Sequence, residues 1–228
     1  MRTVAFCEID EDCRSVLAEH WPGVPVYDDV TTLTADRLRA DGIDVSAICG
    51  GFPCQDASLG QTQWGKRVGS DGDRTGLYVH VIRLAADLRP AVIALENVPG
   101  LLSAGFGRVL GDLAAIGFDA EWRCMPASSA GLPHRRDRLW IVAYPRGSRL
   151  SGFVKGQSLL ESAAASLAVY GDPAARAWRA LDGDLDSLRG SDGVSVAMER
   201  RRIKPIGNAI SPPLSEAIGR AIHERLAA

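Results

Sequence analysis

The chain has 228 residues, of which 46% are hydrophobic and 24% are charged, and this composition is typical of one globular domain with a buried core. The formal net charge of -2 excludes a uniformly basic nucleic-acid coat, so nucleic-acid binding would need local basic clusters. Five cysteines without a Cys-x-x-Cys pair argue against a disulfide framework or a metal site and indicate a reducing, cytoplasmic setting. There is no signal-peptide pattern and no run long enough to span a membrane.

A strand and a helix are predicted at the start of the chain. The apolar run 3–8 predicts a strand, and the pattern over 12–20 predicts a helix with Val16 and Leu17 on its inner face. Glu8 closes the strand, and an acid at this place in α/β folds commonly receives the ribose hydroxyls of a nucleotide. A solvated strand end explains Glu8 equally well from this stretch alone.

A second unit of the same kind leads to a loop that contains a cysteine. A short extended piece is expected at 25–27, a helix capped by Thr34 through about Ala40, and a buried parallel strand at 45–49. The segment Gly-Gly-Phe-Pro-Cys-Gln-Asp follows at 50–56. Loops at the carboxyl edge of a doubly wound sheet hold the chemistry of such folds, so this loop is a candidate site.

Cys54 is the candidate nucleophile of this loop. Pro53 fixes its own backbone and pushes Phe52 toward extended geometry, so the thiol is presented by a stiff turn. Gly50 and Gly51 allow a ligand to approach the backbone closely. For an isolated cysteine in such a loop, a buried structural role is the more common explanation, because cysteine is among the most buried residue types.

A second apolar strand supplies a carboxyl group that changes this balance. Residues 59–74 are polar and aperiodic, either a lid or a connection, and 76–88 have helical spacing. The strand at 91–95 then runs into Glu96. If the two strands are parallel neighbours, Cys54 and Glu96 share one edge of the sheet, and partial burial would raise the pKa of Glu96 enough for it to donate a proton near neutrality.

The second half of the chain adds basic groups. The predicted elements are a short helix at 109–116, an extended segment at 120–125, a strand at 139–144 and an alanine-rich helix at 159–169. Arg136 and Arg138 alternate at the entrance of the strand, where two planar donors on one face could hold a phosphate or a pyrimidine carbonyl. A solvated charge cluster is the alternative, as it is for the basic run 199–204.

In this order, the motifs resemble those of the DNA cytosine-5 methyltransferases. Gly-Gly-Phe-Pro-Cys54-Gln is similar to the family's nucleophile loop, and Glu96-Asn97-Val98 to its acid motif. Arg136-x-Arg138 resembles a Gln-x-Arg-x-Arg signature, although His134 stands where the family has glutamine. Gly-Asn208-Ala209-Ile, followed by a helix to Leu226, resembles the C-terminal motif.

The resemblance implies a doubly wound, Rossmann-like S-adenosylmethionine methyltransferase fold that acts on a cytosine flipped out of double-stranded DNA. Cys54 would add to carbon 6, Glu96 would protonate or hydrogen-bond ring nitrogen 3, Arg138 would steady the ring carbonyl, and Arg136 would hold the loop or a backbone phosphate. The implied contacts to S-adenosylmethionine are Glu8, Ile9, Asp29, Val30, Pro53, Leu77, Asn208 and Ala209.

The resemblance also implies a division of the chain and a departure from the family. Residues 1–145 would form the catalytic core, 146–200 a reduced variable region for target recognition, and 201–228 the returning C-terminal motif. The family's first strand and glycine-rich cofactor loop have no counterpart here, so we expect this chain alone to bind S-adenosylmethionine weakly. It would be a monomer unless another polypeptide supplies that strand.

Partners and competing functions follow from the same resemblance. The implied partners are double-stranded DNA and a cognate restriction endonuclease that acts on the same site without direct contact. The alternatives are a non-catalytic remnant that retains a DNA-binding surface and an RNA-directed member of the family. A cysteine hydrolase is disfavoured because no histidine motif pairs with Cys54.

Overall fold

The computed structural model describes residues 2–52, 77–103, 105–130, 136–151, 158–167 and 212–227. These residues belong to two compact units, one of 1–123 with 139–152 and the other of 124–138 with 153–228. The predicted site residues Pro53, Cys54, Asn208 and Ala209 lie outside the described residues, as does His134.

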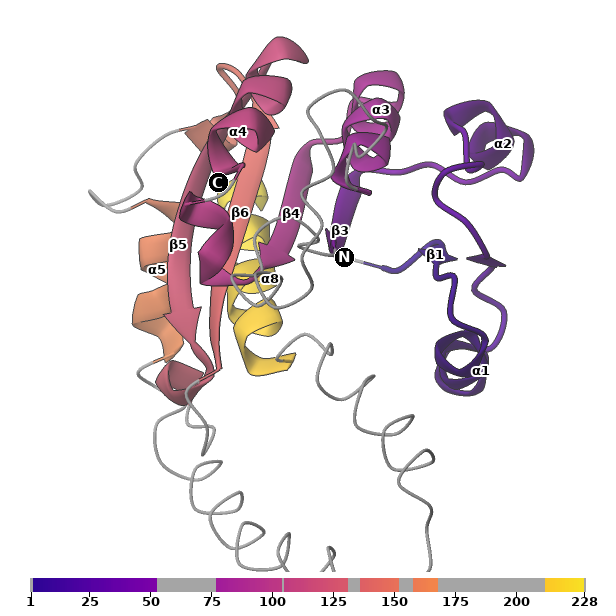
Figure 1. The fold of residues 1–228 in the computed structure, drawn as a ribbon, viewed down its shortest axis with the longest axis horizontal. Coiled ribbons are helices and arrows are strands. Elements are labelled where there is room, and N and C mark those ends of the chain that lie inside the picture. Colours follow the sequence, from indigo (N-terminus) through magenta and orange to yellow (C-terminus); the bar gives the residue numbers. More distant parts are fainter. Residues whose placement is uncertain are drawn as a thin grey trace, which may run out of the picture. The chain divides into compact units, whose positions relative to one another are not determined.

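A mixed four-stranded sheet in the order β3-β4-β6-β5 forms the centre of the first unit (Figure 1). Its strands are β3 (Ala47–Gly51), β4 (Val92–Asn97), β5 (Phe118–Pro126) and β6 (Asp137–Pro145), the last two of which continue into the second unit. β3 and β4 are parallel neighbours. Ala47 pairs with Val92 at the start of the ladder, and Gly51 pairs with Glu96 at its end. The predicted parallel pairing is therefore confirmed, whereas β6 runs antiparallel to β4.

A separate two-stranded parallel sheet precedes it, formed by β1 (Phe6–Cys7) and β2 (Val26–Tyr27). Helix α1 (Glu11–His20) connects the two strands and begins at Asp10, whose carboxylate accepts from the N–H groups of Asp12 and Cys13. The expectation that Val16 is on the inner face is wrong, because 52% of its surface is exposed. Consecutive helical residues point about 100° apart, and only Leu17 of the pair is half-buried.

Two helices fasten this N-terminal part to β3. Helix α2 (Ala35–Ala40) begins at Thr34, whose Oγ1 accepts from Arg37 N–H at 3.1 Å, as the sequence predicted. Helix α3 (Tyr78–Leu88) ends at Arg89, whose φ of 51° is left-handed. Leu33, Leu38 and Leu84 form a small apolar cluster, against which half-buried side chains of the first strands pack.

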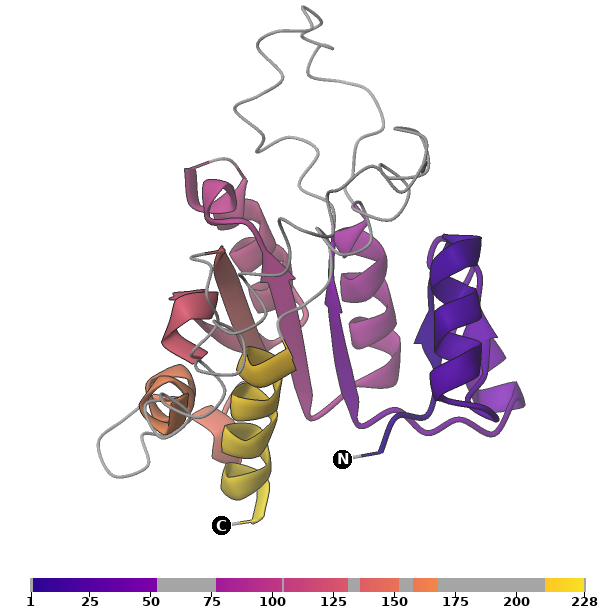
Figure 2. The ribbon, with the colours of Figure 1, turned by 90° about the horizontal axis from the view of Figure 1, so that it is seen from below.

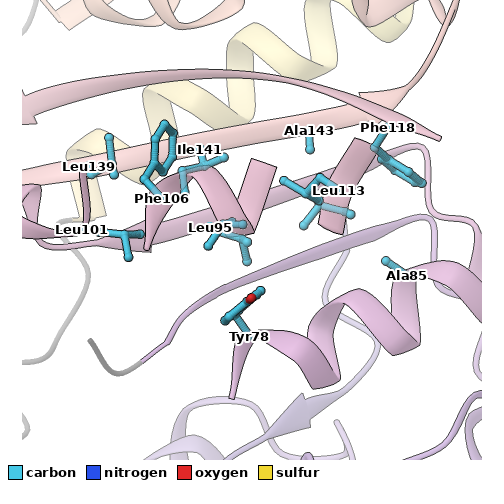
Figure 3. Packing of buried hydrophobic residues seen from close by; sticks show 12 residues of the cluster. Tyr78, Ala85, Leu95, Leu101, Phe106, Leu113, Phe118, Leu139, Ile141 and Ala143 are labelled. Atoms are coloured by element: carbon cyan, nitrogen blue, oxygen red, sulfur yellow. The ribbon is translucent and has the colours of Figure 1, made fainter. Parts of the chain in front are cut away.

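The main core lies between the sheet and helices α3 and α4 (Phe106–Ala115), with the short 3-10 helix η2 (Pro99–Ser103) beside α4. Figure 2 shows α3 alongside β3. Alternate residues of β4 and β6, including Ile93, Leu95 and Ile141, point into this core. Figure 3 shows how the helices cover that face of the sheet; the residues labelled there are Tyr78, Ala85, Leu95, Leu101, Phe106, Leu113, Phe118, Leu139, Ile141 and Ala143.

Among the described strands, β3 lies at one edge of the four-stranded sheet. Ser46 O accepts from Ala91 N at 2.9 Å, so the alternate residues Ile48 and Gly50 share the side that pairs with β4. The main-chain groups of Ala47, Cys49 and Gly51 point the other way and meet no partner within the described ranges. The expectation of a buried strand is therefore only partly right: Cys49 and Gly51 are exposed because one edge of the strand is uncovered.

Two helices account for most of the described part of the second unit. Helix α5 (Leu159–Leu167) confirms the predicted alanine-rich helix, and α8 (Pro212–Ala227) is the C-terminal helix. They pack against each other and against the short 3-10 helix η3 (Ala127–Ala130). A further 3-10 turn, η4 (Arg149–Ser151), follows β6 in the first unit. Among the described helices, none is both long and apolar enough to cross a bilayer.

Candidate active site

The end of β3 and the end of β4 form the first part of the candidate site. Gly51 pairs with Glu96, and the two residues share one face of the sheet. A Cβ atom at position 51 would be 3.1 Å from Glu96 Oε2, so the carboxyl group lies directly against the glycine backbone. Only 7% of Glu96 is exposed, which confirms the predicted burial of this carboxyl. The group that lies close to the Gly51 backbone in the structure is Glu96, and the approach of a ligand to this glycine stays a prediction.

Asn97 ties the chain beyond β3 to β4. Its Nδ2 donates to Phe52 O at 3.0 Å, and its Oδ1 accepts from Val98 N–H at 2.8 Å. Asn97 is 3% exposed, so both ends of a buried amide are satisfied. This arrangement fixes the backbone two residues before Cys54.

Phe52 is also held from the opposite side by helix α3. The centroids of the Phe52 and Tyr78 rings are 5.6 Å apart, and the two ring planes are inclined at 47°. Tyr78 Oη donates to Asp112 Oδ2 at 2.7 Å, and burial together with this bond raises the pKa of Tyr78 to about 12. Phe52, two positions before Cys54, is therefore held by contacts to both β4 and α3.

Four cysteines lie in the described residues, and none is suited to be a nucleophile. Burial, followed by the charges of Asp29, Glu8 and Asp28, raises the pKa of Cys7 to about 11. The pKa of each of the others is also raised, with partial burial of the thiol as the first cause: Cys13, Cys49 and Cys124. Because all four pKa values are raised, these thiols stay protonated near neutral pH. They are poorly reactive in that form, since the thiolate is the nucleophile.

The two predicted arginines belong to the second unit. Arg138 lies in β6 and donates from Nη1 to Asp137 O at 2.9 Å. Arg136 precedes the strand with a φ of 25°. The shared face predicted for the two arginines stays a prediction, because φ of Arg136 orients the chain that precedes it and not its side chain relative to Arg138. Leu139, the next residue after Arg138, pairs with Asn97.

Two of the predicted cofactor residues follow β1. Glu8 N–H donates to Tyr27 O at 2.9 Å, and the Glu8 carboxylate accepts from Asp10 N–H at 2.9 Å through Oε1. Ile9 is 72% exposed, which leaves an apolar side chain open beside this carboxylate. The pair is suited to a ligand with hydroxyl groups next to an apolar ring.

Two more follow β2, the parallel partner of β1. Asp29 Oδ1 accepts from Thr31 N–H at 2.8 Å, and bonds to Thr31 lower the pKa of Asp29. Val30 comes next and is half-buried. Because parallel neighbours end at the same edge, the acids after β1 and β2 are close together, and both Glu8 and Asp29 act on the thiol of Cys7. Leu77, at the start of α3, is 38% exposed.

Sequence patterns missed three residues that hold this region. Asn97 was placed in the acid motif without a structural role. Arg14 and Arg83 each donate hydrogen bonds to two loop carbonyl groups. In the sequence they are ordinary arginines within the helical patterns of α1 and α3. No sequence signal identifies such contacts, because they depend on which loop the fold brings to the helix.

A comparison with protein families supports what the site indicates. The family model of the C-5 cytosine-specific DNA methylases matches residues 1–168. The chain therefore belongs to the C-5 cytosine-specific DNA methylase family.

Curated relatives of the chain are named Type II methyltransferases. The chain is 33% identical over 149 residues to the Type II methyltransferase M2.BsuMI of Bacillus subtilis, a match that covers 62% of this chain and 36% of the relative. It is 31% identical over 147 residues to M.DsaV of Dactylococcopsis salina, covering 63% and 39%. The chain thus spans well under half the length of these two relatives.

Solved structures agree on the fold, a Rossmann-like α/β methyltransferase architecture. A DNMT2 mutant of Spodoptera frugiperda matches with a TM-score of 0.52 at 22% identity, over 68% of this chain and 45% of the other. A putative DNA modification methyltransferase of an Escherichia coli prophage matches with a TM-score of 0.51 at 24% identity, over 64% and 41%.

Proposed function

We propose that this chain transfers a methyl group from S-adenosylmethionine to carbon 5 of a flipped cytosine in double-stranded DNA, with Cys54 as nucleophile and Glu96 as acid. The observation that carries the proposal is the buried carboxyl of Glu96 against Gly51, on the strand that leads to Cys54. Only Pro53 lies between Phe52 and Cys54, and two steps along the chain span at most about 7 Å. Cys54 therefore remains within reach of the edge at which Glu96 lies.

The chemistry needs both groups. The thiolate of Cys54 forms a bond to carbon 6 of the ring while Glu96 shares a proton with ring nitrogen 3, which makes carbon 5 nucleophilic. When bound, S-adenosylmethionine supplies the electrophilic methyl group for carbon 5. Loss of the carbon 5 proton and cleavage of the bond between sulfur and carbon 6 then restore the thiolate and release 5-methylcytosine.

The described residues fit the adenosine end of S-adenosylmethionine. Ribose hydroxyls and the adenine amino group are donors, and Glu8 and Asp29 offer carboxylate acceptors at neighbouring strand ends. The exposed apolar side chains of Ile9 and Leu77 and the half-buried Val30 suit the flat ring. Pro53, Asn208 and Ala209 complete the proposed set.

The remaining assignments concern the DNA. We infer that Arg138 steadies the carbonyl of the flipped base and Arg136 a loop or backbone phosphate, because planar guanidinium groups suit both partners. Residues 1–145 would form the catalytic core, residues 146–200 would recognise the target sequence, and residues 201–228 would form the returning C-terminal motif. Relatives named Type II methyltransferases support a cognate restriction endonuclease as functional partner. The methyltransferase would act in the cytoplasm, as a monomer unless another polypeptide supplies the family's first strand.

A trapping assay tests the proposal. A pool of randomised DNA duplexes containing 5-fluorocytosine is mixed with the protein and S-adenosylmethionine, because fluorine at carbon 5 blocks release and leaves a covalent adduct. We expect the adduct with the wild type and with the control Cys49→Ser, and none with Cys54→Ser. An adduct that survives Cys54→Ser, or its absence from the wild type, contradicts the proposal. A matching RNA pool that forms the adduct instead would favour the RNA-directed alternative.

A further inference from the structure

Two arginines hold the two loops that carry the proposed cofactor residues. Arg14, in α1, donates from Nη1 to Glu8 O at 3.2 Å and to Ile9 O at 2.7 Å. These carbonyls belong to the segment between β1 and α1, in which the Glu8 side chain also accepts from Asp10 N–H. A half-buried guanidinium thus fixes the backbone of both residues proposed to contact the ribose end.

Arg83 makes the same arrangement from a distant part of the chain. Its Nη2 donates to Val30 O at 3.0 Å and to Leu33 O at 2.7 Å. The loop between these carbonyls is a compact turn, because Asp29 O accepts from the N–H groups of Thr32 and Leu33. Arg83 thereby attaches this turn to α3, and the neighbouring Leu84 packs on Leu33.

Hydrogen bonds from a charged donor to a carbonyl are stronger than neutral ones. The bonds to Glu8 O, Val30 O and Leu33 O are also partly buried, which shields them from water. A loop that is already ordered loses little conformational entropy when a ligand binds to it, so the ligand binds more tightly than it would to a flexible loop. In both loops the arginine binds main-chain oxygens and leaves the carboxylates of Glu8 and Asp29 available. Arg83 also sits on the helix whose first residue, Tyr78, contacts Phe52.

We propose that Arg14 and Arg83 are positioning residues that preorganise the loops 8–10 and 29–33 for the adenosine part of the cofactor. This inference rests on the proposed function for its ligand. It adds two residues outside the motifs that carry the family resemblance, and it gives α3 a second role as the support of both the cofactor loop and the residue before the cysteine loop.

The test compares Arg14→Met and Arg83→Met with a matched control. Arg39→Met removes an arginine of α2 that donates to Asp87 O of α3 at 2.8 Å and to Asp36 at 2.8 Å, so it also binds a main-chain carbonyl but one in neither loop. Amide exchange by NMR reports each loop separately, through Asp10 N–H for the first and the N–H groups of Thr31 and Leu33 for the second. S-adenosylhomocysteine, titrated into the millimolar range by calorimetry, reports binding.

We expect Arg83→Met to speed exchange at Thr31 and Leu33 by about tenfold, and Arg14→Met to do so at Asp10. If the binding-competent loop is populated about tenfold less, the apparent affinity for S-adenosylhomocysteine falls by the same factor. Arg83→Lys should lie between wild type and Arg83→Met, since an ammonium reaches a carbonyl as a point donor without the planar fork. Arg39→Met should match the wild type in both measurements.

Each other result contradicts the inference in a distinct way. Unchanged exchange in both methionine variants would show that the arginines do not hold the loops. Faster exchange with unchanged affinity would show that they stabilise the fold alone. Absence of binding already in the wild type would overturn the cofactor assignment and the positioning role with it, whereas the trapping assay decides separately on Cys54.

Discussion

The backbone of Gly51 lies against the carboxyl group of Glu96, with only 3.1 Å between Glu96 Oε2 and the place where a Cβ atom would be. The two residues are paired across parallel strands, and two residues, Phe52 and Pro53, lie between Gly51 and Cys54 along the chain. A side chain at position 51 would push the carboxyl away from its present place. The smallest residue is therefore required here by a neighbouring side chain, although the backbone itself is regular.

Gly51→Ala should slow adduct formation in the trapping assay by at least about tenfold, because displacement of a reacting group by a fraction of an ångström is costly. Gly50→Ala is the matched control, since a Cβ atom there meets nothing within 4 Å among the described residues. The control should react like the wild type and be no less stable, because alanine is favoured over glycine within a strand. Equal rates for the two variants would contradict the role given to this contact.

Glu96→Gln should lower the rate of adduct formation by roughly 100-fold, since it removes the proton donor and keeps the shape. The thermal midpoint should stay the same or rise, because a buried carboxyl costs desolvation that a neutral amide avoids. Rate and midpoint measured on the same preparation separate the two effects. A loss of rate that only parallels a loss of folded protein would argue against an acid role.

Asn97→Leu should destabilise the protein by about 1–3 kcal/mol, because Phe52 O and Val98 N–H would lose their buried partner. Urea unfolding measures the change. Ser103→Ala is the control: the exposed Ser103 Oγ donates to Gly100 O at 3.0 Å, and its removal should cost no more than about 0.5 kcal/mol. A cost for Asn97→Leu as small as that of the control would mean that the tie to Phe52 does not order the loop.

Tyr78→Phe should change the dependence of stability on alkaline pH. The pKa of Tyr78 is raised to about 12 by burial and by its bond to Asp112, against about 10 in the unfolded chain. Between these values only the unfolded chain loses the proton, so the stabilisation from Tyr78 is complete below about pH 10 and is lost as pH rises toward 12. Urea unfolding of both proteins across this range should show a stability difference that shrinks with pH. A constant difference would contradict the shifted pKa.

Local patterns were sufficient where one residue type has one common role. Thr34 caps α2 as its position predicted, and two apolar runs gave the parallel pair β3 and β4. In each case the signal lies within a few neighbouring residues, which is the range over which capping and strand periodicity act. The acid Glu96 was placed correctly for the same reason.

Features set by distant parts of the chain could not be predicted. Val16 satisfied the helical pattern but is exposed, because burial depends on what the fold brings to that face. Arg83 reaches a turn 50 residues away in the sequence, and no periodicity encodes that contact. Arg136 has a left-handed φ just before β6, and a basic run in the sequence gives no signal for such a backbone conformation.

The uncovered side of β3 has a practical consequence for handling the protein. Along Ala47, Cys49 and Gly51, donors and acceptors are spaced to match any extended peptide, and within the part of the chain described here no charged side chain or proline on this strand blocks the approach. At high protein concentration, aggregation would then proceed by pairing of β3 with an extended segment of another molecule, while the helices remain folded. A single proline at position 49, which removes one outward N–H and spares the contacts to β4, would be the first choice to improve solubility.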